Sequence, residues 1–336
     1  MVDVDFQLEL IQWVRIGVLT LCFGGAAWLD HKTRRVSNEW WWTWAKPTLF
    51  LLCLELLLLE ANWMIWLTTS AVVAFASTAL IGRPDISDIM SGSRMDILVT
   101  IWYFASGVGL VMGAMEYIPI LLDYFDPNVY VDSSAPLTES ALLWGQMVVM
   151  GLVLLFFEMA WRFRMLHGGA DAKAMMLATL LLPSWNGASF PFISSGESFS
   201  TAMPPALSLL IWAGLAFLVL PFLMLIRNAS AGDLKPFSMS WHASRMALSE
   251  IPDNHVWLLE EVVDKPDGSR GVTRRMRPVR GSRSETEVES VLDELASEGV
   301  EKAWVTAKHP FLLFVFPAIL PLVLFGDPIV WITGYL

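Results

Sequence analysis

Long apolar blocks separated by short polar connections dominate the chain, and this pattern predicts membrane-spanning helices. A span needs roughly 20 apolar residues, and residues 47–82 form one nearly continuous block about twice that length. Because Glu60-Ala61-Asn62 interrupts the block, we divide it into a helical hairpin. The first block has no basic segment before it, which favours a retained span over a cleaved signal peptide. The predicted spans are 8–29, 45–60, 63–82, 96–119, 140–160, 171–183, 204–226 and 309–334.

The long polar stretch at residues 228–308 has the pattern of a small α+β insert. Its predicted elements are a strand at 255–259, a turn at 265–268, a return strand at 271–279 that forms a hairpin with the first, a helix after a capping-box pattern at Ser284 and Glu287, and a strand at 302–306. The chain thus divides into a transmembrane bundle at 1–227, the insert at 228–308, and a C-terminal transmembrane helix at 309–336. Two roles for the insert stay open: a lid or spacer, or direct contact with a substrate.

Composition excludes several classes of protein. Apolar residues make up 55% of the chain and charged residues 16%, whereas a soluble domain has roughly 45–50% and about 25%. The 17 Trp suit a membrane protein, because Trp collects at membrane interfaces. A formal net charge of -11 argues against nucleic acid as a partner. Cys22 and Cys53 support neither a disulfide framework nor a thiolate zinc site. We therefore predict neither a metal nor a cofactor.

The basic residues predict the topology. Apart from Arg15, the other 21 of the 22 Lys and Arg fall at or between alternate connections, and the intervening connections contain none. Because basic loops stay in the cytoplasm, the amino terminus is expected outside and the 228–308 insert inside the cell. The sequence therefore predicts an all-α polytopic membrane bundle of about eight transmembrane helices with a small cytoplasmic α+β insert. The basic connections are 32–46, 83–94, 162–173, 227–283 and 302–308.

Ionisable residues within the predicted spans are the candidates for chemistry, because each one is costly in a bilayer. Glu158 lies one turn before Arg162, which favours a pair on the helix surface. Glu55 lies near a span centre, where a structural hydrogen bond is the simplest account. Asp30 and Asp171 differ, since both lie at the cytoplasmic ends of their spans and can meet. The full set is Arg15, Asp30, Glu55, Glu60, Asp96, Glu116, Glu158 and Asp171.

Small residues precede the second of these aspartates, in the run Gly168-Gly169-Ala170-Asp171. Glycine removes a side chain where another backbone must come close, either a helix or an extended peptide. The start of a helix also favours a carboxylate there. An ordinary acidic helix cap after a flexible turn is the alternative interpretation of the same residues.

Three segments together resemble the type IV prepilin peptidase family. Asp30-x-Lys32-x-Arg34-x-Val36-x-Asn38, directly after a first span, resembles its first active-site motif. Gly168-Gly169-Ala170-Asp171-x-Lys173 resembles its second, the G-x-G-D element. The segment 304–311 is similar to the closing region of the archaeal branch, the preflagellin (prearchaellin) peptidases.

The resemblance implies a membrane aspartic protease that uses Asp30 and Asp171 as a catalytic dyad with no cofactor. Its implied partners, apart from the lipid bilayer, are prepilin or prearchaellin precursors with class III signal peptides. Such a peptide has a short basic leader, a small residue at the cut and an apolar helix. Lys32 and Arg34 would repel the leader, so we interpret them as interface anchors. The leader is expected to meet acids such as Asp85 and Asp88.

Departures from the family pattern narrow the prediction. Ala170 replaces the second glycine of the motif, and four predicted spans separate the aspartates where the compact archaeal relatives have two. The cysteine motif of the bacterial enzymes is missing, so the resemblance implies peptidase activity and no N-methylation.

Three alternatives to a prepilin peptidase stay open: a proton-coupled transporter that uses Glu55, a presenilin-like protease, and an inactive assembly factor. The presenilin alternative lacks its Tyr-Asp dipeptide in this chain.

Overall fold

The computed structural model describes residues 4–82, 94–166, 168–185, 203–264, 270–278 and 285–333. The chain forms two compact units. The first, the helical unit, comprises Met1–Ala213 and Phe311–Leu336, and the second, the insert unit, comprises Gly214–Pro310. The turn at 265–268, the capping residue Ser284 and the acids Asp85 and Asp88, all singled out above, lie outside the described residues.

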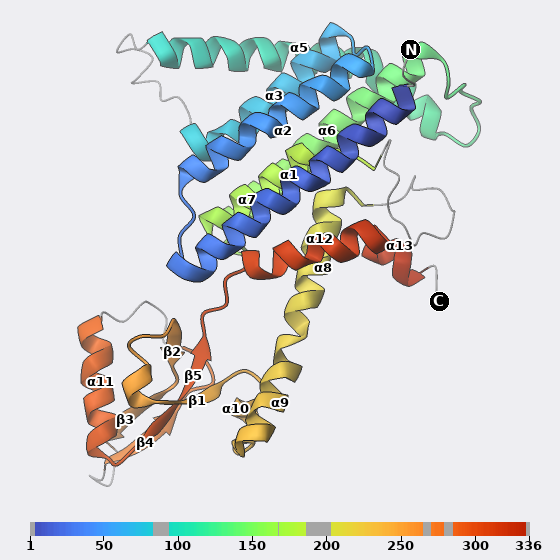
Figure 1. Cartoon of the computed structure of the whole chain (residues 1–336). Coiled ribbons are helices and arrows are strands. Elements are labelled where there is room, and N and C mark those ends of the chain that lie inside the picture. Colours follow the sequence, from blue (N-terminus) through green and yellow to red (C-terminus); the bar gives the residue numbers. More distant parts are fainter. Residues whose placement is uncertain are drawn as a thin grey trace. The chain divides into compact units, whose positions relative to one another are not determined.

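The helical unit consists of long apolar helices (Figure 1). Five helical stretches of the described chain are long and apolar enough to cross a membrane: Val4–Thr33, Trp63–Leu80, Arg94–Phe125, Pro136–Arg162 and Pro205–Ala231. The predicted fold class, a polytopic helical membrane protein with a small insert, is therefore confirmed. The helices are α1 (Val4–Thr33), α2 (Asn38–Leu58), α3 (Trp63–Ile81), α5 (Arg94–Phe125), α6 (Pro136–Arg162), α7 (Gly169–Leu181), α8 (Pro205–Leu218), α12 (Leu312–Phe325) and α13 (Pro328–Thr333). The division between the units falls within α8.

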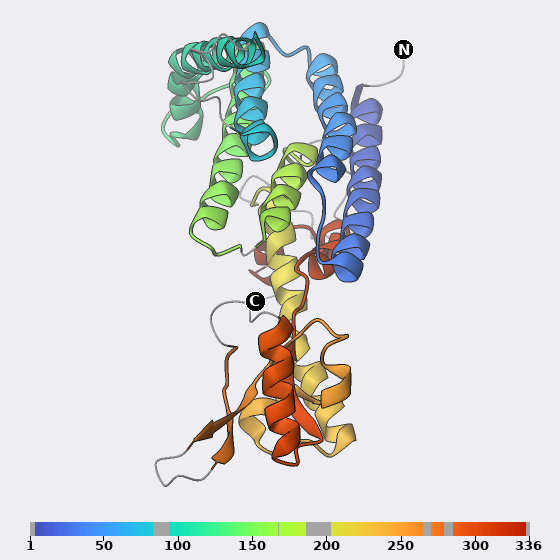
Figure 2. The same cartoon turned by 90° about the vertical axis from the view of Figure 1, so that its left-hand side faces the viewer.

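The short helix α7 lies at the centre of the helical unit. It contacts α1, α2, α3 and α6, and both views show it among α1, α2 and α6 (Figure 1 and Figure 2). All its residues from Ala174 to Leu181 are buried, so its apolar sequence is explained by packing against other helices. At 13 residues it is about 20 Å long, whereas the hydrocarbon core is about 30 Å thick. The predicted span 171–183 therefore does not cross a bilayer as this helix alone.

The C-terminal segment differs from the single span predicted at 309–334. The helix α12 ends at Phe325, Gly326 takes a positive φ of 70°, and α13 begins at Pro328. Asp327 is buried at the break, where its carboxyl accepts the N–H groups of Ile329 at 2.8 Å and Met203 at 2.5 Å. Glycine and proline interrupt the helix, and the aspartate satisfies backbone groups that the interruption leaves free.

The insert unit contains two small antiparallel sheets and a helix. The sheet β1-β5-β2 is formed by Ser244–Ala247, Lys302–Ala307 and Val256–Leu258, and a hairpin pairs β3 (Glu260–Asp264) with β4 (Arg270–Arg274). The helix α11 (Glu285–Ser297) buries Leu292 and Leu295 in one core with Ala303 and Val305 of β5. The remaining elements are α9 (Leu220–Ala231), α10 (Phe237–Ser240) and a 3-10 turn at Leu248–Glu250.

Strand pairing in the insert unit corrects the predicted hairpin. The segment 271–279 was expected to pair with 255–259, but β4 pairs with β3, and β2 pairs with β5. The chain changes partners at Leu259, whose N–H donates to the Trp304 carbonyl and whose carbonyl accepts from Arg275. The strand β5 is buried along its middle, so it needs a neighbour on each side, and β2 supplies one of them.

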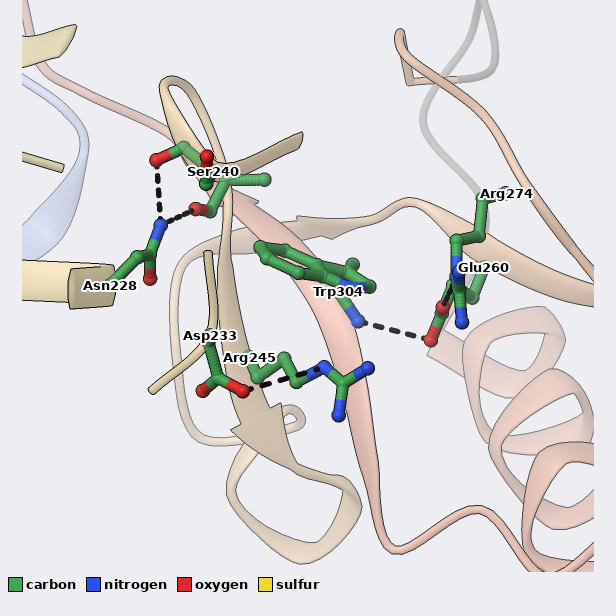
Figure 3. A network of polar contacts seen from close by, with 8 residues as sticks. Asn228, Asp233, Ser240, Arg245, Glu260, Arg274 and Trp304 are labelled. Atoms are coloured by element: carbon green, nitrogen blue, oxygen red, sulfur yellow. Dashed lines mark hydrogen bonds and ion pairs between the residues drawn. The ribbon is translucent and has the colours of Figure 1, made fainter. Parts of the chain in front are cut away.

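Buried polar groups brace the centre of the insert unit (Figure 3). The Glu260 carboxylate accepts hydrogen bonds from the backbone N–H of Trp304 at 3.1 Å and from the side-chain Nε–H of Arg274 at 2.7 Å. Asn228, which is 1% exposed, donates to the carbonyls of Ser240 and Ala243, both at 2.7 Å. The Glu260 carboxylate and the Asn228 amide nitrogen are therefore matched to backbone or charged partners, as burial favours.

Candidate active site

The first aspartate of the candidate site lies in the last turn of α1. After Thr33 the helix ends, and Arg34 adopts a left-handed conformation with φ of 56° while its N–H donates to the Asp30 carbonyl at 3.0 Å. The positive charge of the Arg34 guanidinium attracts the Asp30 carboxylate. Four residues later α2 begins at Asn38, so the end of α1 and the start of α2 stay close together.

The second aspartate lies in the first turn of α7, directly after the glycines. Gly168 caps the helix, and its carbonyl accepts the N–H of Asp171 at 3.1 Å. A Cβ atom added to Gly168 would lie 2.5 Å from the Asp171 Oδ2 atom, closer than real Cβ atoms approach other atoms. A Cβ on Gly169 would meet Trp161 only at 3.8 Å, an ordinary contact. A side chain at 168 would therefore displace the Asp171 carboxyl, whereas one at 169 would not.

The tertiary structure brings the two motifs together. The helices α1, α2 and α7 all contact one another, and Asp30 acts electrostatically on Asp171. Both aspartates are half-buried. Lys173, two residues after Asp171, donates from Nζ to the Asn38 Oδ1 atom at 2.7 Å. The Asn38–Lys173 contact was not predicted, because no local pattern relates residues in distant segments.

The remaining motif residues surround this pair. Ala170 is half-buried, and Lys32 is exposed beyond the aspartate. Arg34 is half-buried, and its Nε atom is buried without a hydrogen-bond partner in the described part of the chain. Within the described residues, no three His, Cys, Asp or Glu side chains gather as metal ligands would.

A hollow of about 350 Å³ lies against the turn between α6 and α7. Trp161, Arg162, Arg164 and Leu166 line it, and Trp161 is the side chain nearest to Gly169. Arg164 adopts a left-handed conformation with φ of 58°. The hollow therefore combines positive charge with an aromatic wall, in the segment that precedes the second aspartate.

Two other candidate ionisable residues of the predicted spans, Glu158 and Glu55, form ion pairs. Glu158 and Arg162 form the expected pair on one helix, with Arg162 Nε to Glu158 Oε1 at 2.9 Å. Glu55 has a partner that the sequence analysis did not name, because Arg15 of α1 lies 2.8 Å from its Oε2 atom. Both members are buried, at 0% exposed for Arg15 and 4% for Glu55. The sequence did contain a sign of this pairing, because Arg15 and Glu55 carry opposite charges and lie in the consecutive helices α1 and α2.

Comparison with known proteins points to one family. Residues 235–328 match the family model described as Archaeal Peptidase A24 C-terminus Type II. The matched segment includes the tail residues 304–311 but neither Asp30 nor Asp171. A search of curated proteins found no match. The family match supports the assignment of this helical membrane protein to the prepilin and preflagellin peptidase family, a family of proteases.

Proposed function

We propose that the protein is a membrane aspartic endopeptidase that removes class III signal peptides from prepilin or prearchaellin precursors. The observation that carries the proposal is that α1 contacts α7 and brings Asp30 within electrostatic range of Asp171, from a distant motif. Two half-buried carboxyls within electrostatic range of each other have the arrangement that a catalytic dyad needs. The family match supports protease activity, although the matched residues 235–328 do not include either aspartate.

The two carboxyls of such a dyad share one proton, because two like charges a few ångströms apart cannot both ionise readily. The ionised carboxyl takes a proton from a water molecule, and the resulting oxygen attacks the scissile carbonyl. The protonated carboxyl donates a hydrogen bond to that carbonyl and then supplies the proton for the leaving amine. The Gly168 backbone N–H and the start of α7 favour negative charge on Asp171, whereas burial and the neighbouring Asp30 favour its protonated form, so we assign the shared proton to the pair and not to one aspartate.

The small residues before Asp171 suit an extended substrate. The lack of a side chain at Gly168 leaves the carboxyl exposed to a peptide backbone, and Ala170 adds only a methyl group. A substrate would then lie with its small residue at this point and its apolar helix in the bilayer. The arginine-lined hollow beside Gly169 repels a basic leader, so the leader lies on another side. Asp85 and Asp88 remain our proposed contacts for the leader.

The proposed topology places this chemistry at the cytoplasmic face. Basic connections follow α1 and precede α7, and the positive-inside rule assigns both to the cytoplasm. The amino terminus is then outside, and residues 228–308 are cytoplasmic. A transporter that relays protons through Glu55 is less well supported, because Arg15 neutralises that carboxylate within a buried pair.

Co-expression with a precursor tests the proposal. A precursor with a basic leader, a glycine at the cut and an apolar segment should show a faster-migrating product only when the chain is present. The matched control is the same precursor with the glycine replaced by a bulky residue, which should remain uncut. If neither archaellin, pilin nor substrate-binding-protein precursors are cut by a chain that is inserted in the membrane, the peptidase assignment is wrong.

A further inference from the structure

One hydrogen bond joins the two segments that carry the candidate dyad. Lys173 Nζ lies 2.7 Å from Asn38 Oδ1, across 135 positions of sequence. A lysine ammonium can only donate, so the amide oxygen of Asn38 must be the acceptor. The two atoms therefore define the orientation of the Asn38 side chain as well as the contact between α2 and α7.

The bond lies close to both aspartates along the chain. Asn38 begins α2 after the short turn that follows Asp30 and α1, while Lys173 lies in the same helical turn as Asp171. Among the described residues, it is the only side-chain hydrogen bond that we find from α7 to another helix. Beyond Lys173, the buried stretch from Ala174 to Leu181 contacts its neighbours mainly through apolar side chains.

Close packing of apolar side chains sets the rotation of the buried part of a helix, whereas a directional hydrogen bond can fix an end that is packed less tightly. The helix α7 is buried on nearly all sides, and its residues after Lys173 are mostly Ala, Met and Leu. Its first turn, from Gly169 to Asp171, is only half-buried, so packing restrains it less than the rest of the helix. A small movement there would shift the Asp171 carboxyl. A directional contact at Lys173 is placed to prevent such movement.

We infer that Lys173 and Asn38 are positioning residues, whose hydrogen bond sets α7 against the start of α2 and so holds Asp171 at its working distance from Asp30. This inference rests on the proposed function for its catalytic consequence. The contact itself can be assessed without any substrate.

Steady-state kinetics of the purified full chain test the catalytic consequence. The substrate is a fluorogenic peptide with a basic leader, a glycine at the cut and an apolar segment. Lys173→Met and Asn38→Leu should each lower kcat by about 100-fold with little change in KM, because small misplacements of a reacting group have costs of this size. Lys173→Arg and Asn38→Asp, which preserve donor and acceptor, should restore most of kcat. Lys46→Met, at an exposed lysine of the same helix α2, is the matched control and should behave as the wild type.

The double variant distinguishes a shared contact from two separate effects. Lys173→Met combined with Asn38→Leu should be no slower than either single change, since both remove the same interaction. A normal kcat in Lys173→Met, or full additivity in the double variant, overturns the inference. So does a loss of kcat that only follows a lower fraction of folded protein in detergent melting curves.

Disulfide trapping gives a readout that needs no catalysis. In a Cys53→Ser background, Asp30→Cys and Asp171→Cys should cross-link under mild oxidation in native membranes. Lys173→Met should slow this by roughly tenfold, because disulfide formation demands a narrow geometry. If the wild-type chain cuts no precursor while Lys173 still controls trapping, the proposed function fails and the positioning inference stands. If cleavage occurs and trapping ignores Lys173, the positioning inference fails alone.

Discussion

The middle of α1 and its last turn place charged side chains against neighbouring helices in opposite ways. In the middle, Arg15 meets Glu55 of α2 at 2.8 Å, and both are buried. At the end, Asp30 lies within electrostatic range of Asp171 of α7, and both remain half-buried. Opposite charges cancel in a buried pair, whereas two acids repel each other unless they share a proton. The opposite charges of the first pair suit a structural role, whereas the two acids of the second are the pair that we propose for the chemistry.

The largest expected effect comes from removing either acid of the like-charged pair. Asp30→Asn and Asp171→Asn should each lower precursor cleavage by at least roughly 1,000-fold, because each carboxyl has a separate role in moving the proton. Cleavage is measured by the mobility shift of a co-expressed precursor. Membrane insertion and the detergent melting temperature should stay normal. Near-normal cleavage by either pure variant would remove the dyad from the mechanism.

Breaking the opposite-charged pair should affect stability instead. Glu55→Leu leaves Arg15 buried without its partner and should destabilise the helical unit by about 3–5 kcal/mol. Arg15→Met combined with Glu55→Leu should recover most of that loss, because two apolar side chains replace the pair. Thermal unfolding in detergent measures both, and cleavage per folded molecule should be unchanged. If Glu55→Leu abolished activity at normal stability, Glu55 would belong to the chemistry.

The two glycines before Asp171 should respond differently to the same small change. Gly168→Ala brings a Cβ atom to 2.5 Å from Asp171 Oδ2, so the carboxyl must move, and cleavage should fall by about 100-fold. Gly169→Ala meets Trp161 at 3.8 Å and should be tolerated, with helix stability equal or higher by up to about 1 kcal/mol. Kinetics and melting curves of the two variants, side by side, check this. Equal activities would show that the motif works as a flexible turn only.

The smallest effect is expected from the pair within one helix. Arg162 is half exposed and bonds Glu158 four residues before it. Arg162→Met should lower the unfolding free energy by about 1–2 kcal/mol, less than the loss at Glu55, because Arg162 is half exposed to solvent although its partner Glu158 is buried. A melting curve measures it, with Lys46→Met as the control. A loss comparable to that of Glu55→Leu would contradict the distinction between local and tertiary pairs.

Local patterns in the sequence predicted much of the architecture. Apolar blocks mark the helices, and the polar stretch after residue 227 contains the predicted helix, its last strand and a return strand near their observed places. The Glu158–Arg162 pair was also predictable, since residues four apart on a helix are always neighbours. These features depend on periodicity or composition within a few turns of chain, so no knowledge of packing is needed to recognise them.

Only the tertiary structure decides which residues of distant segments contact one another. The sequence identified Arg15 and Glu55 separately, and likewise Asn38 and Lys173, but did not pair either set. Pairing depends on the rotation of each helix and on which helices are adjacent, and these follow from the packing of the whole unit. The exchange of strand partners at Leu259 has the same origin. The sequence by itself thus determined the elements and the candidate aspartates, whereas packing alone decided which charged groups meet.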